Sequence, residues 1–302
     1  MNVLITGATG YVGRNLIFAL TKMSHTIGLL VRDMEKANDL FGEHENIKLI
    51  DQNVNLLKTS IEEFNPKVVI HLATHSTSSD DYENMRSLIN TNILYSTEIL
   101  DALKNCQVRL FINTGTFAEY YYSDGNLESA YLYAATKTAF RSILDYYKKI
   151  IGFNVINVIP YTIYGENDTR KKVFHYLLEA LDSPSSIHMT AGEQILDLIY
   201  IDDVVDFFIT ILNNINTLSQ FTNYSLDLHL GTGIGTSIKE LTNYIETITN
   251  KKANIHWGAK PYRKFDIMYA VAPISKNIEL LGWRAKTPLV KGLQKLIETY
   301  NN

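Results

Sequence analysis

Two groups of residues in this sequence have the types and spacing to do chemistry, and the first is a tyrosine four positions before a lysine. On a helix, Tyr133 and Lys137 would share one face, because side chains four residues apart are neighbours there. A nearby ammonium group favours the phenolate, so we expect Lys137 to lower the pKa of Tyr133 below about 10. Tyr133 would then give and take protons near neutral pH. Tyrosine and lysine are common in this chain, so the position of the pair must support the interpretation.

The second group consists of Gly7, Gly10 and Gly13, which follow a short apolar run and precede a helical pattern over Tyr11–Lys22. Gly7 would allow a tight turn, Gly10 would let a pyrophosphate approach the backbone, and Gly13 would permit close packing of helix on strand. The helix N-terminus would offer free N–H groups to the phosphates. An ordinary strand, turn and helix without a ligand is the alternative.

These residues need a scaffold, and the alternation of β-branched runs with longer helical patterns predicts an α/β fold. The predicted strands are Asn2–Thr6, Thr26–Val31, Ile47–Ile50, Lys67–Leu72, Val108–Asn113 and Asn154–Ile159. Near-continuous apolar strands indicate a parallel sheet covered on both faces, which is a Rossmann-type doubly wound sheet. Right-handed crossovers bring the carboxyl ends of the strands to one edge, where we expect the chemistry.

Two predicted helices are unusually long, Asp80–Asn105 and Ala130–Ile151. They either cover the sheet or pair across a homodimer interface. After residue 164 the pattern loosens into short strands and helices, including Ser237–Thr249. We therefore predict a dinucleotide-binding domain over 1–164 and a smaller C-terminal α/β substrate lobe over 165–302, with the chain crossing between them.

Composition narrows the function classes. The 302 residues are 46% hydrophobic and 20% charged, with a formal net charge of −4. No basic stripe indicates a nucleic-acid partner, and no apolar run approaches the roughly 18 residues of a membrane span. The opening residues lack a basic stretch, so we expect no signal peptide. The single cysteine, Cys106, favours a reducing, cytoplasmic setting.

Thr116 lies just beyond the predicted fifth strand and shortly before Tyr133. Its hydroxyl could bond the same substrate oxygen as the Tyr133 hydroxyl. Two hydroxyls around a carbonyl suit hydride transfer: a nicotinamide supplies the hydride, Tyr133 delivers the proton, and Thr116 steadies the oxygen. The alternative is that Thr116 only caps a turn.

The order of these motifs resembles the extended short-chain dehydrogenase/reductases that act on nucleotide sugars. The matching pieces are residues 7–13, 71–73, Asn92, Thr116, Tyr133 with Lys137, 164–165 and 281–283. Residues 190–194, 200–203 and 258–272 are similar to the branch that contains CDP-abequose and CDP-paratose synthases. That resemblance implies NADPH-dependent reduction of the 4-keto group of a CDP-4-keto-3,6-dideoxyhexose, within the biosynthesis of surface-polysaccharide sugars.

The resemblance also leaves rival activities open. Family members that dehydrate sugars carry an Asp-Glu pair directly after the threonine, whereas Phe117 and Ala118 stand here and Glu119 comes one place later. Dehydration is therefore not expected. A nucleotide-sugar C4 epimerase with bound NAD would use the same tyrosine, lysine and threonine. A non-catalytic dinucleotide-binding sensor is the alternative from another class.

The cofactor phosphate is predicted from the end of the second strand, where Arg32 stands. An arginine suits a 2′-phosphate, so we expect NADPH rather than NADH, although Asp33 follows directly. The resemblance and the glycine pattern together give the expected cofactor-binding residues: Gly7, Thr9, Gly10, Tyr11, Val12, Gly13, Arg32, Asp51, Leu72, Ala73, Asn92, Lys137 and Pro160.

For the substrate we expect Thr116, Lys172 and Arg263, the last matched to a diphosphate-binding arginine of the family. A lone surface arginine is the competing interpretation. The chain departs from the family at Leu196, where an arginine is expected, and at Glu166, which replaces a proline.

Two further patterns predict less. His71 and His75 have the spacing of metal ligands, but without a third ligand we expect no metal. The glycine-rich segment 231–235 resembles a phosphate loop only by composition, and a turn followed by a helix cap explains it better.

Overall fold

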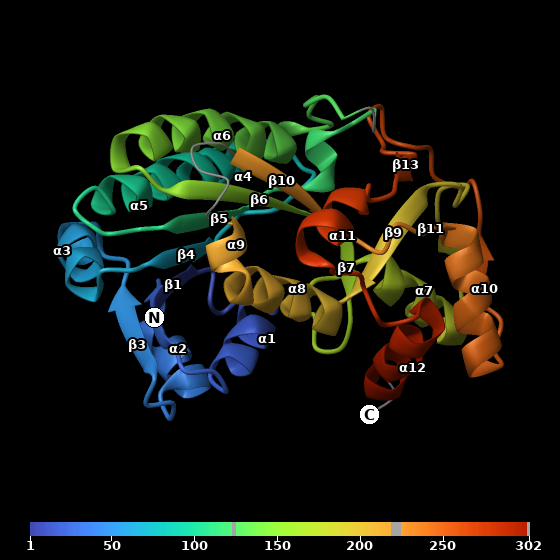
Figure 1. The fold of residues 1–302 in the computed structure, drawn as a ribbon. Coiled ribbons are helices and arrows are strands. Elements are labelled where there is room, and N and C mark those ends of the chain that lie inside the picture. The colour runs from blue at the N-terminus through green and yellow to red at the C-terminus, as the bar shows by residue number, and fades with distance from the viewer. Residues whose placement is uncertain (123–124, 219–224, 301–302) are drawn as a thin grey trace.

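The computed structural model describes residues 1–122, 125–218 and 225–300. Within them, seven parallel strands form one sheet in the order β10-β6-β5-β4-β1-β2-β3 (Figure 1). Their bounds are β1 Asn2–Thr6, β2 Thr26–Val31, β3 Ile47–Asp51, β4 Val68–His71, β5 Leu110–Thr114, β6 Asn154–Pro160 and β10 Ser225–Leu230. The chain thus forms the doubly wound, Rossmann-type sheet that the sequence predicts.

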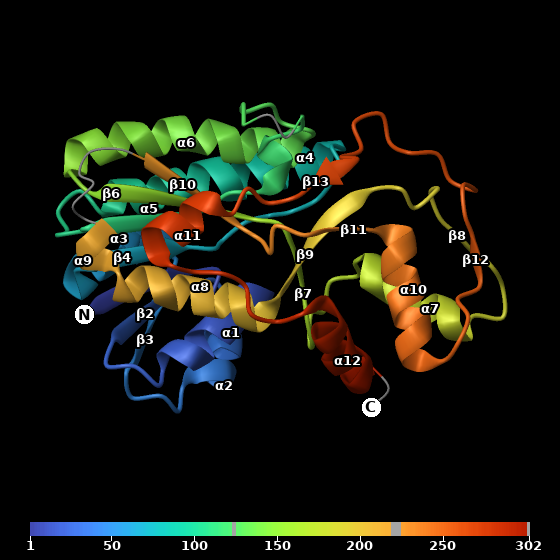
Figure 2. The same ribbon diagram turned by 45° about the vertical axis from the view of Figure 1, so that its right-hand side comes forward.

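Helices cover both faces of this sheet (Figures 1 and 2). The helices are α1 Tyr11–Leu20, α2 Met34–Phe41, α3 Val54–Phe64, α4 Tyr82–Ile89, α5 Ser96–Ala102, α6 Leu132–Ile151 and α8 Ile201–Asn213. Alternate residues of β1 serve the two layers: Val3 and Ile5 pack in the core with α1, α2 and α8, whereas Leu4 packs with α3, α5 and α6. Burial on both faces explains why these strands are almost continuously apolar.

The six predicted strands are all present, with ends that differ by at most two residues. The predicted long helix over Asp80–Asn105 is different. It is α4, then a π-helical segment Asn90–Tyr95, then α5. The π segment contains Asn92, whose buried side chain is drawn inward by four hydrogen bonds, and Ser96 Oγ donates to the Thr91 carbonyl at 3.1 Å.

The second part of the chain builds a smaller α/β lobe. Its strands are β7 Thr162–Tyr164, β8 Ile187–His188, β9 Ile195–Tyr200, β11 Gly235–Ser237, β12 Ile255–His256 and β13 Tyr269–Ala270. Its helices are α7 Val173–Asp182, α10 Ile238–Thr249, α11 Ser275–Leu281 and α12 Leu289–Tyr300, whereas α9 Ile215–Leu218 packs with α8 at the first sheet (Figure 1). β7, β11 and β13 all pair with β9, and β8 pairs with β12.

The chain crosses between the two lobes more than once. β10 pairs in parallel with β6, from Ser225 opposite Val155 to Leu230 opposite Pro160, and so extends the first sheet. α8 packs against α1 on the same layer. A boundary at residues 164 and 165 therefore divides the sequence and not the structure, because α8 and β10 come after it and pack with the first sheet.

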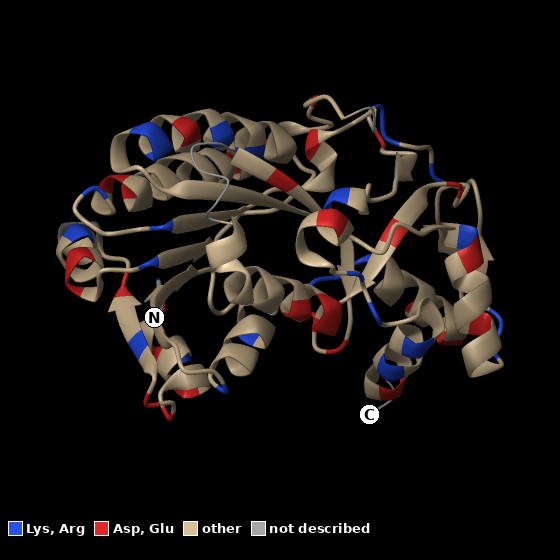
Figure 3. Cartoon of the chain, in the orientation of Figure 1, with Lys and Arg blue, Asp and Glu red and all other residues tan. Residues whose placement is uncertain are grey.

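Charged residues of both signs are interspersed over the helices of the two lobes (Figure 3). Within the described part of the chain, every helix is too short or too polar to cross a bilayer.

Candidate active site

The first glycine loop joins β1 to α1 and packs against the segment that follows β4. Gly7 has φ +70°, and a Cβ there would lie 2.7 Å from the backbone nitrogen of Ala73. A Cβ at Gly13 would lie 2.8 Å from the Ala8 carbonyl oxygen. Gly10 begins α1 without a capping side chain. The loop therefore needs Gly7 and Gly13 and leaves the helix N-terminus free to bind a pyrophosphate, so these residues fit a dinucleotide.

The residues between these glycines have different surroundings. Thr9 and Val12 are half-buried, whereas Tyr11 is buried. The Tyr11 hydroxyl has no hydrogen-bond partner among the described residues, and a Cβ at Gly165 would lie 2.6 Å from it. The Tyr11 ring thus fixes the loop against the small lobe, so a contact of Tyr11 with a cofactor would come from its backbone.

The ends of β2 and β3 carry Arg32, Asp33 and Asp51, whose side chains have different surroundings. Asp33 caps α2, and its Oδ1 accepts a hydrogen bond from the Lys36 backbone nitrogen at 3.0 Å. Arg32 is exposed at the end of β2. Asp51 ends the neighbouring β3 opposite Val31 and is exposed as well, with Oδ1 bound to the Asn53 nitrogen at 3.0 Å. Of the two residues after β2, the arginine has the freer side chain.

Tyr133, Lys137 and Thr116 come from two elements that meet at the carboxyl edge of the sheet. Tyr133 and Lys137 lie one turn apart on α6, and their exposed fractions are 8% and 4%. Thr116 follows β5 and is 7% exposed. α6 packs against the 3₁₀ turn Phe117–Glu119 that Thr116 begins. The predicted trio is thus brought to one buried edge.

The electrostatics of Tyr133 differ from the sequence prediction. Burial raises the pKa of Tyr133 to about 12, against hydrogen bonds from the side chains of Thr74 and Ser76 that lower it. The expected lowering of this pKa by Lys137 is therefore wrong, because desolvation of the phenolate is the larger effect. At neutral pH Tyr133 is a protonated phenol, which is a proton donor.

Lys137 is the group at this edge whose pKa is shifted toward neutral pH. Burial lowers the pKa of Lys137 to about 8; the negative charge of Glu119 opposes this, and the positive charge of Arg141 adds to it. His71 lies nearby at the end of β4, and burial, followed by the charge of Lys137, lowers its pKa to about 3. His71 is therefore neutral, held between Thr6 Oγ1 at 2.9 Å and Ser96 Oγ at 3.0 Å.

Asn92 links the elements around Tyr133. Its Oδ1 accepts hydrogen bonds from the His75 nitrogen at 2.9 Å and from Thr74 Oγ1 at 3.1 Å. Its Nδ2 donates to the His75 carbonyl and to Thr136 Oγ1, both at 3.0 Å. Thr136 lies between Tyr133 and Lys137 in α6. Asn92 therefore joins the loop after β4 to the helix that carries both residues.

Thr116 does cap a turn, as the alternative interpretation holds. Its Oγ1 accepts a hydrogen bond from the Ala118 nitrogen at 3.3 Å, and Glu119 Oε2 accepts one from the Thr116 nitrogen at 2.8 Å. Capping uses the hydroxyl only as an acceptor, so its proton can still be donated to a substrate oxygen. The two interpretations of Thr116 are compatible.

The residues expected to bind substrate have contrasting surroundings. Lys172 is engaged within the protein: its Nζ lies 2.6 Å from Asp168 Oδ2 and donates to the Ile163 carbonyl at 2.9 Å. Arg263 is exposed in the segment ahead of β13 and lies near Tyr131. Burial raises the pKa of Tyr131, and the charge of Arg263 opposes that rise. Tyr131 stacks on Tyr133 with ring centres 6.2 Å apart. Arg263 thus lies near the candidate site.

Pro160 ends β6 opposite Leu230, at the same edge of the sheet. Sequence reasoning missed Thr74, Ser76, Tyr131 and Arg141. The first two carry a signal that could have been used, because they are hydroxyl residues directly after a buried parallel strand, where ligand-binding side chains gather.

The second glycine segment, 231–235, is an internal anchor. Asp197 of β9 is fully buried, and its carboxylate accepts hydrogen bonds from the Thr232, Gly233 and Ala272 nitrogens at 2.8, 2.8 and 3.1 Å. Thr232 Oγ1 donates to it as well, at 2.7 Å. A side chain of the protein occupies the position that an anion would take.

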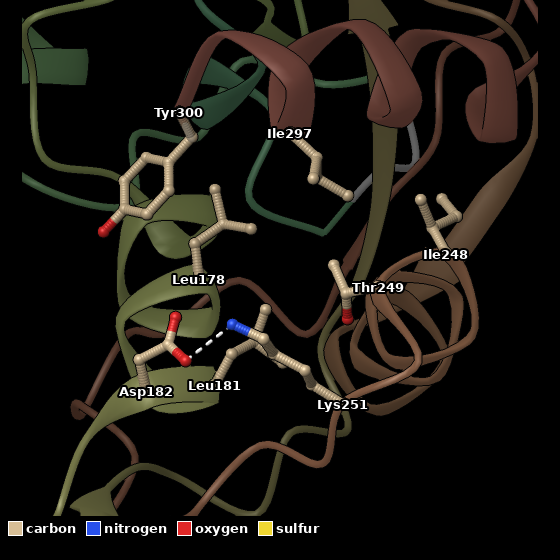
Figure 4. A pocket seen from close by; sticks show the side chains of 8 residues that line it. All are labelled: Leu178, Leu181, Asp182, Ile248, Thr249, Lys251, Ile297 and Tyr300. Atoms are coloured by element: carbon tan, nitrogen blue, oxygen red, sulfur yellow. Dashed lines mark hydrogen bonds and ion pairs between the residues drawn. The ribbon is translucent and has the colours of Figure 1, made fainter. Parts of the chain in front are cut away.

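A pocket of about 250 Å³ lies elsewhere, among α7, α10 and α12 of the small lobe (Figure 4). Leu178, Leu181, Ile248 and Ile297 line it, and the ion pair of Lys251 and Asp182 spans 2.7 Å at its side. None of its lining residues belongs to the edge that carries Tyr133. Among the described residues, no three histidine, cysteine or acidic side chains are grouped to hold a metal ion.

The sequence of this chain is similar to a known family and to named relatives over most of its length. Residues 3–226 match the model of the NAD dependent epimerase/dehydratase family. CDP-abequose synthase of Salmonella typhimurium is 29% identical over 98% of this chain and 97% of its own length. The enzyme of the same name from Yersinia pseudotuberculosis is 29% identical over 89% and 91%.

Solved structures share the fold over the whole chain. UDP-glucuronic acid 4-epimerase of Bacillus cereus, in complex with UDP-glucuronic acid and NAD, superposes with a TM-score of 0.84 at 20% identity, covering 100% of this chain and 99% of that one. UDP-glucose 4-epimerase of Thermus thermophilus, in complex with NAD, gives a TM-score of 0.81 at 19% identity with the same coverage.

Proposed function

The chain belongs to the NAD dependent epimerase/dehydratase family, and from this premise we propose that it reduces the 4-keto group of a nucleotide-linked deoxyhexose with NADPH. The proposed substrate is a CDP-4-keto-3,6-dideoxyhexose, and the relatives named CDP-abequose synthase support this choice. One observation carries the proposal. Tyr133, Lys137 and Thr116 share a buried edge, and the carboxylate of Glu119 beside Thr116 is fully engaged within the protein.

The proposed chemistry assigns one task to each side chain. A nicotinamide dinucleotide, when bound, supplies the hydride for C4. Tyr133, protonated because burial raises its pKa, donates its proton to the O4 oxygen as negative charge develops there. Thr116 donates a hydrogen bond to the same oxygen. Lys137 orients the cofactor ribose, and its positive charge stabilises the phenolate that Tyr133 leaves behind.

Dehydration would need an acid and a base at the sugar. Phe117 and Ala118 have no ionisable group, and both oxygens of Glu119 face Arg141 at 2.8 and 3.2 Å. A buried carboxylate held in this way cannot turn toward a substrate without breaking both of these charge-assisted hydrogen bonds. The side chains therefore favour a reaction that needs only a proton donor at O4.

NADPH is proposed from the end of β2. The carboxylate of Asp33 caps α2, which leaves Arg32 as the side chain best suited to a 2′-phosphate. Asp51, at the end of β3, and Asn92, which bonds the loop after β4, are further residues that we propose lie around the cofactor. Net reduction suits a cofactor that binds, reacts and leaves.

We further propose a homodimer through α4, α5 and α6 and a cytoplasmic location. Large apolar side chains are exposed on these helices: Tyr82, Ile89, Tyr146 and Ile150 are 64%, 42%, 60% and 51% exposed. The free, buried Cys106 suits a reducing compartment. Sedimentation equilibrium would test the dimer, and a monomer at micromolar concentration would contradict it.

The test is turnover on a panel of CDP-, dTDP- and UDP-4-ketosugars, followed by NADPH absorbance. Oxidation of one NADPH per sugar reduced is the expected result. Inversion at C4 without cofactor consumption would establish the rival epimerase, and cofactor binding without turnover on any sugar would establish the sensor.

Tyr133→Phe should lower turnover by about 10²- to 10⁴-fold, because it removes the proton donor, while NADPH affinity stays unchanged. Tyr147→Phe is the matched control. Tyr147 is a buried tyrosine of the same helix, and its hydroxyl bonds Asp101 at 3.1 Å, away from the site. Equal turnover of the Tyr133→Phe variant and the parent would show that another group donates the proton.

A further inference from the structure

Glu119 is a fully buried carboxylate directly behind the site. Its Oε2 accepts a hydrogen bond from the Thr116 nitrogen at 2.8 Å, and its Oε1 accepts one from Thr138 Oγ1 at 3.3 Å. A Cβ at Gly115 would lie 2.5 Å from Oε2. The Glu119 carboxylate therefore packs closely against the backbone of both Gly115 and Thr116.

Arg141 holds Glu119 from α6. Its Nε and Nη2 donate to the two carboxylate oxygens at 2.8 and 3.2 Å, which is a bidentate arrangement. Its Nη1 donates to Asp227 Oδ2 of β10 at 2.7 Å. Arg141 lies one turn beyond Lys137 on α6, as Lys137 lies one turn beyond Tyr133. One helix thus carries both the candidate site and the clamp.

Asp227 ties the clamp to the sheet. Tyr120 donates to Asp227 Oδ2 at 2.6 Å and Asn157 Nδ2 donates to Oδ1 at 2.8 Å. Buried ion pairs rarely add stability over apolar residues of the same size, but they fix geometry strongly once every partner is satisfied. A fully bonded carboxylate against the Thr116 backbone is therefore suited to orienting Thr116.

The clamp also sets the charge around Lys137. The charges that act on the pKa of Lys137 are those of Glu119 from the 3₁₀ turn and Arg141 from α6, and Lys137 in turn lowers the pKa of the neutral His71 from β4. Tyr133 is protonated at neutral pH. Glu119 is thus the negative group that offsets Arg141 beside a buried ammonium.

We propose that Glu119, clamped by Arg141, is a positioning residue that orients Thr116 through its backbone nitrogen and whose charge offsets that of Arg141, one helical turn from Lys137. The expected effect on turnover rests on the proposed function. The effects on Lys137 and on the Thr116 amide do not, so the experiment separates the two proposals.

The first measurement follows Lys137 in the cofactor-free full chain by NMR of ¹³C-labelled lysine, with Lys137→Arg to assign the signal. In Glu119→Gln we expect the proton affinity of Lys137 to fall about tenfold or more, because Arg141 is no longer offset. In Glu119→Gln with Arg141→Met, both charges are gone and the affinity should return to within about threefold of the parent. An unchanged midpoint in the single variant would overturn the proposal.

The second measurement is hydrogen exchange at the Thr116 amide together with kcat. Exchange should become about tenfold faster in Glu119→Gln, because a neutral acceptor replaces a charged one. Where the parent turns over, kcat should fall about 10- to 100-fold with the KM for NADPH unchanged.

Asp227→Asn is the matched control, because it removes a carboxylate from the same arginine without touching Thr116. It should leave Thr116 exchange and the Lys137 midpoint close to the parent. Equal changes in Glu119→Gln and Asp227→Asn would show that Glu119 has only a structural role, and would overturn the proposal. A parent inactive on every ketosugar would count against the proposed function alone.

Discussion

The two glycine-rich loops of this chain look alike in sequence and differ in what their backbone faces. Both follow a strand of the first sheet; the first leads into α1, and the second leads through the short strand β11 into α10. At residues 7–13 the helix α1 begins at Gly10 without a capping side chain, at the carboxyl edge of the sheet. At residues 231–235 the backbone nitrogens of Thr232 and Gly233 both bond the buried carboxylate of Asp197.

This difference shows that glycine spacing describes a backbone shape and not a ligand. The same concave run of N–H groups binds a phosphate or a carboxylate, depending on whether the protein supplies the anion itself. In the second loop the partner comes from β9, 35 positions before Thr232. Nothing within the loop reveals it.

The largest effect should come from the anchor of the second loop. Asp197→Asn replaces an acceptor of four hydrogen bonds by a group with one acceptor oxygen and an NH₂ that faces donors. We expect a loss of about 3 kcal/mol in the free energy of unfolding, measured by urea denaturation, because buried donors lose their acceptor. The affinity for NADPH should stay unchanged where the variant is folded. Weaker NADPH binding by an Asp197→Asn variant of unchanged stability would mean that the second loop binds a ligand.

Removing the buried charge of Lys137, at the edge of the sheet beside the first loop, should instead raise the free energy of unfolding. Lys137 has a pKa of about 8, below its ordinary value of 10.5, because burial penalises its cation. Lys137→Met should therefore stabilise the fold by about 2 to 3 kcal/mol at pH 7 and abolish turnover.

The gain from Lys137→Met should be complete below pH 8, where Lys137 is charged in both states. It should shrink as the pH rises from 8 toward 10.5, because the folded protein then loses the proton while the unfolded chain keeps it. Denaturation at a series of pH values checks this. A constant difference across that range would contradict a lowered pKa.

Much of the first sheet could be predicted because its signals are local. Short apolar strands, helix patterns and the glycine turn each lie within about twenty residues, and the six strands are found where the patterns indicate. β10 was not among the predicted strands. Its residues Ser225–Leu230 alternate between buried and half-buried positions, and their place beside β6 depends on a crossover from the other lobe.

The candidate site, too, has some features that the sequence predicts and others that depend on the folded structure. Tyr133, Lys137 and Thr116 follow from spacing and order. The raised pKa of Tyr133, the π segment around Asn92 and the clamp of Arg141 on Glu119 all depend on which distant side chains meet in a buried space. Burial is a property of the whole fold, so its effect on acidity has no local signature.

Gly10→Ala would sharpen the contrast between the loops with a smaller effect. A Cβ at Gly10 would meet only the Gly7 carbonyl oxygen, at 3.2 Å, so we expect the fold to accommodate it by a small shift of that backbone oxygen. The methyl group would stand where the pyrophosphate approaches, and we expect NADPH affinity to fall about 30-fold, equivalent to about 2 kcal/mol. Gly233→Ala is the matched variant in the second loop. It should lower stability, because Gly233 has φ +77°, and leave NADPH affinity unchanged. Isothermal titration of both variants would decide, and equal losses of affinity would remove the distinction between the loops.

The smallest effect concerns which phosphate the first edge recognises. Arg32 is exposed at the end of β2, while the adjacent Asp33 is committed to the cap of α2. Arg32→Gln removes one charge-assisted contact and should weaken NADPH binding about tenfold, equivalent to about 1.4 kcal/mol, with NADH binding unchanged. Because the contact is exposed, raising the salt concentration should narrow the difference between parent and variant. Fluorescence titration with both cofactors at low and high salt measures this. An equal loss for NADH and NADPH would place Arg32 on the shared part of the cofactor, and tighter NADH than NADPH binding by the parent would assign this edge to NAD.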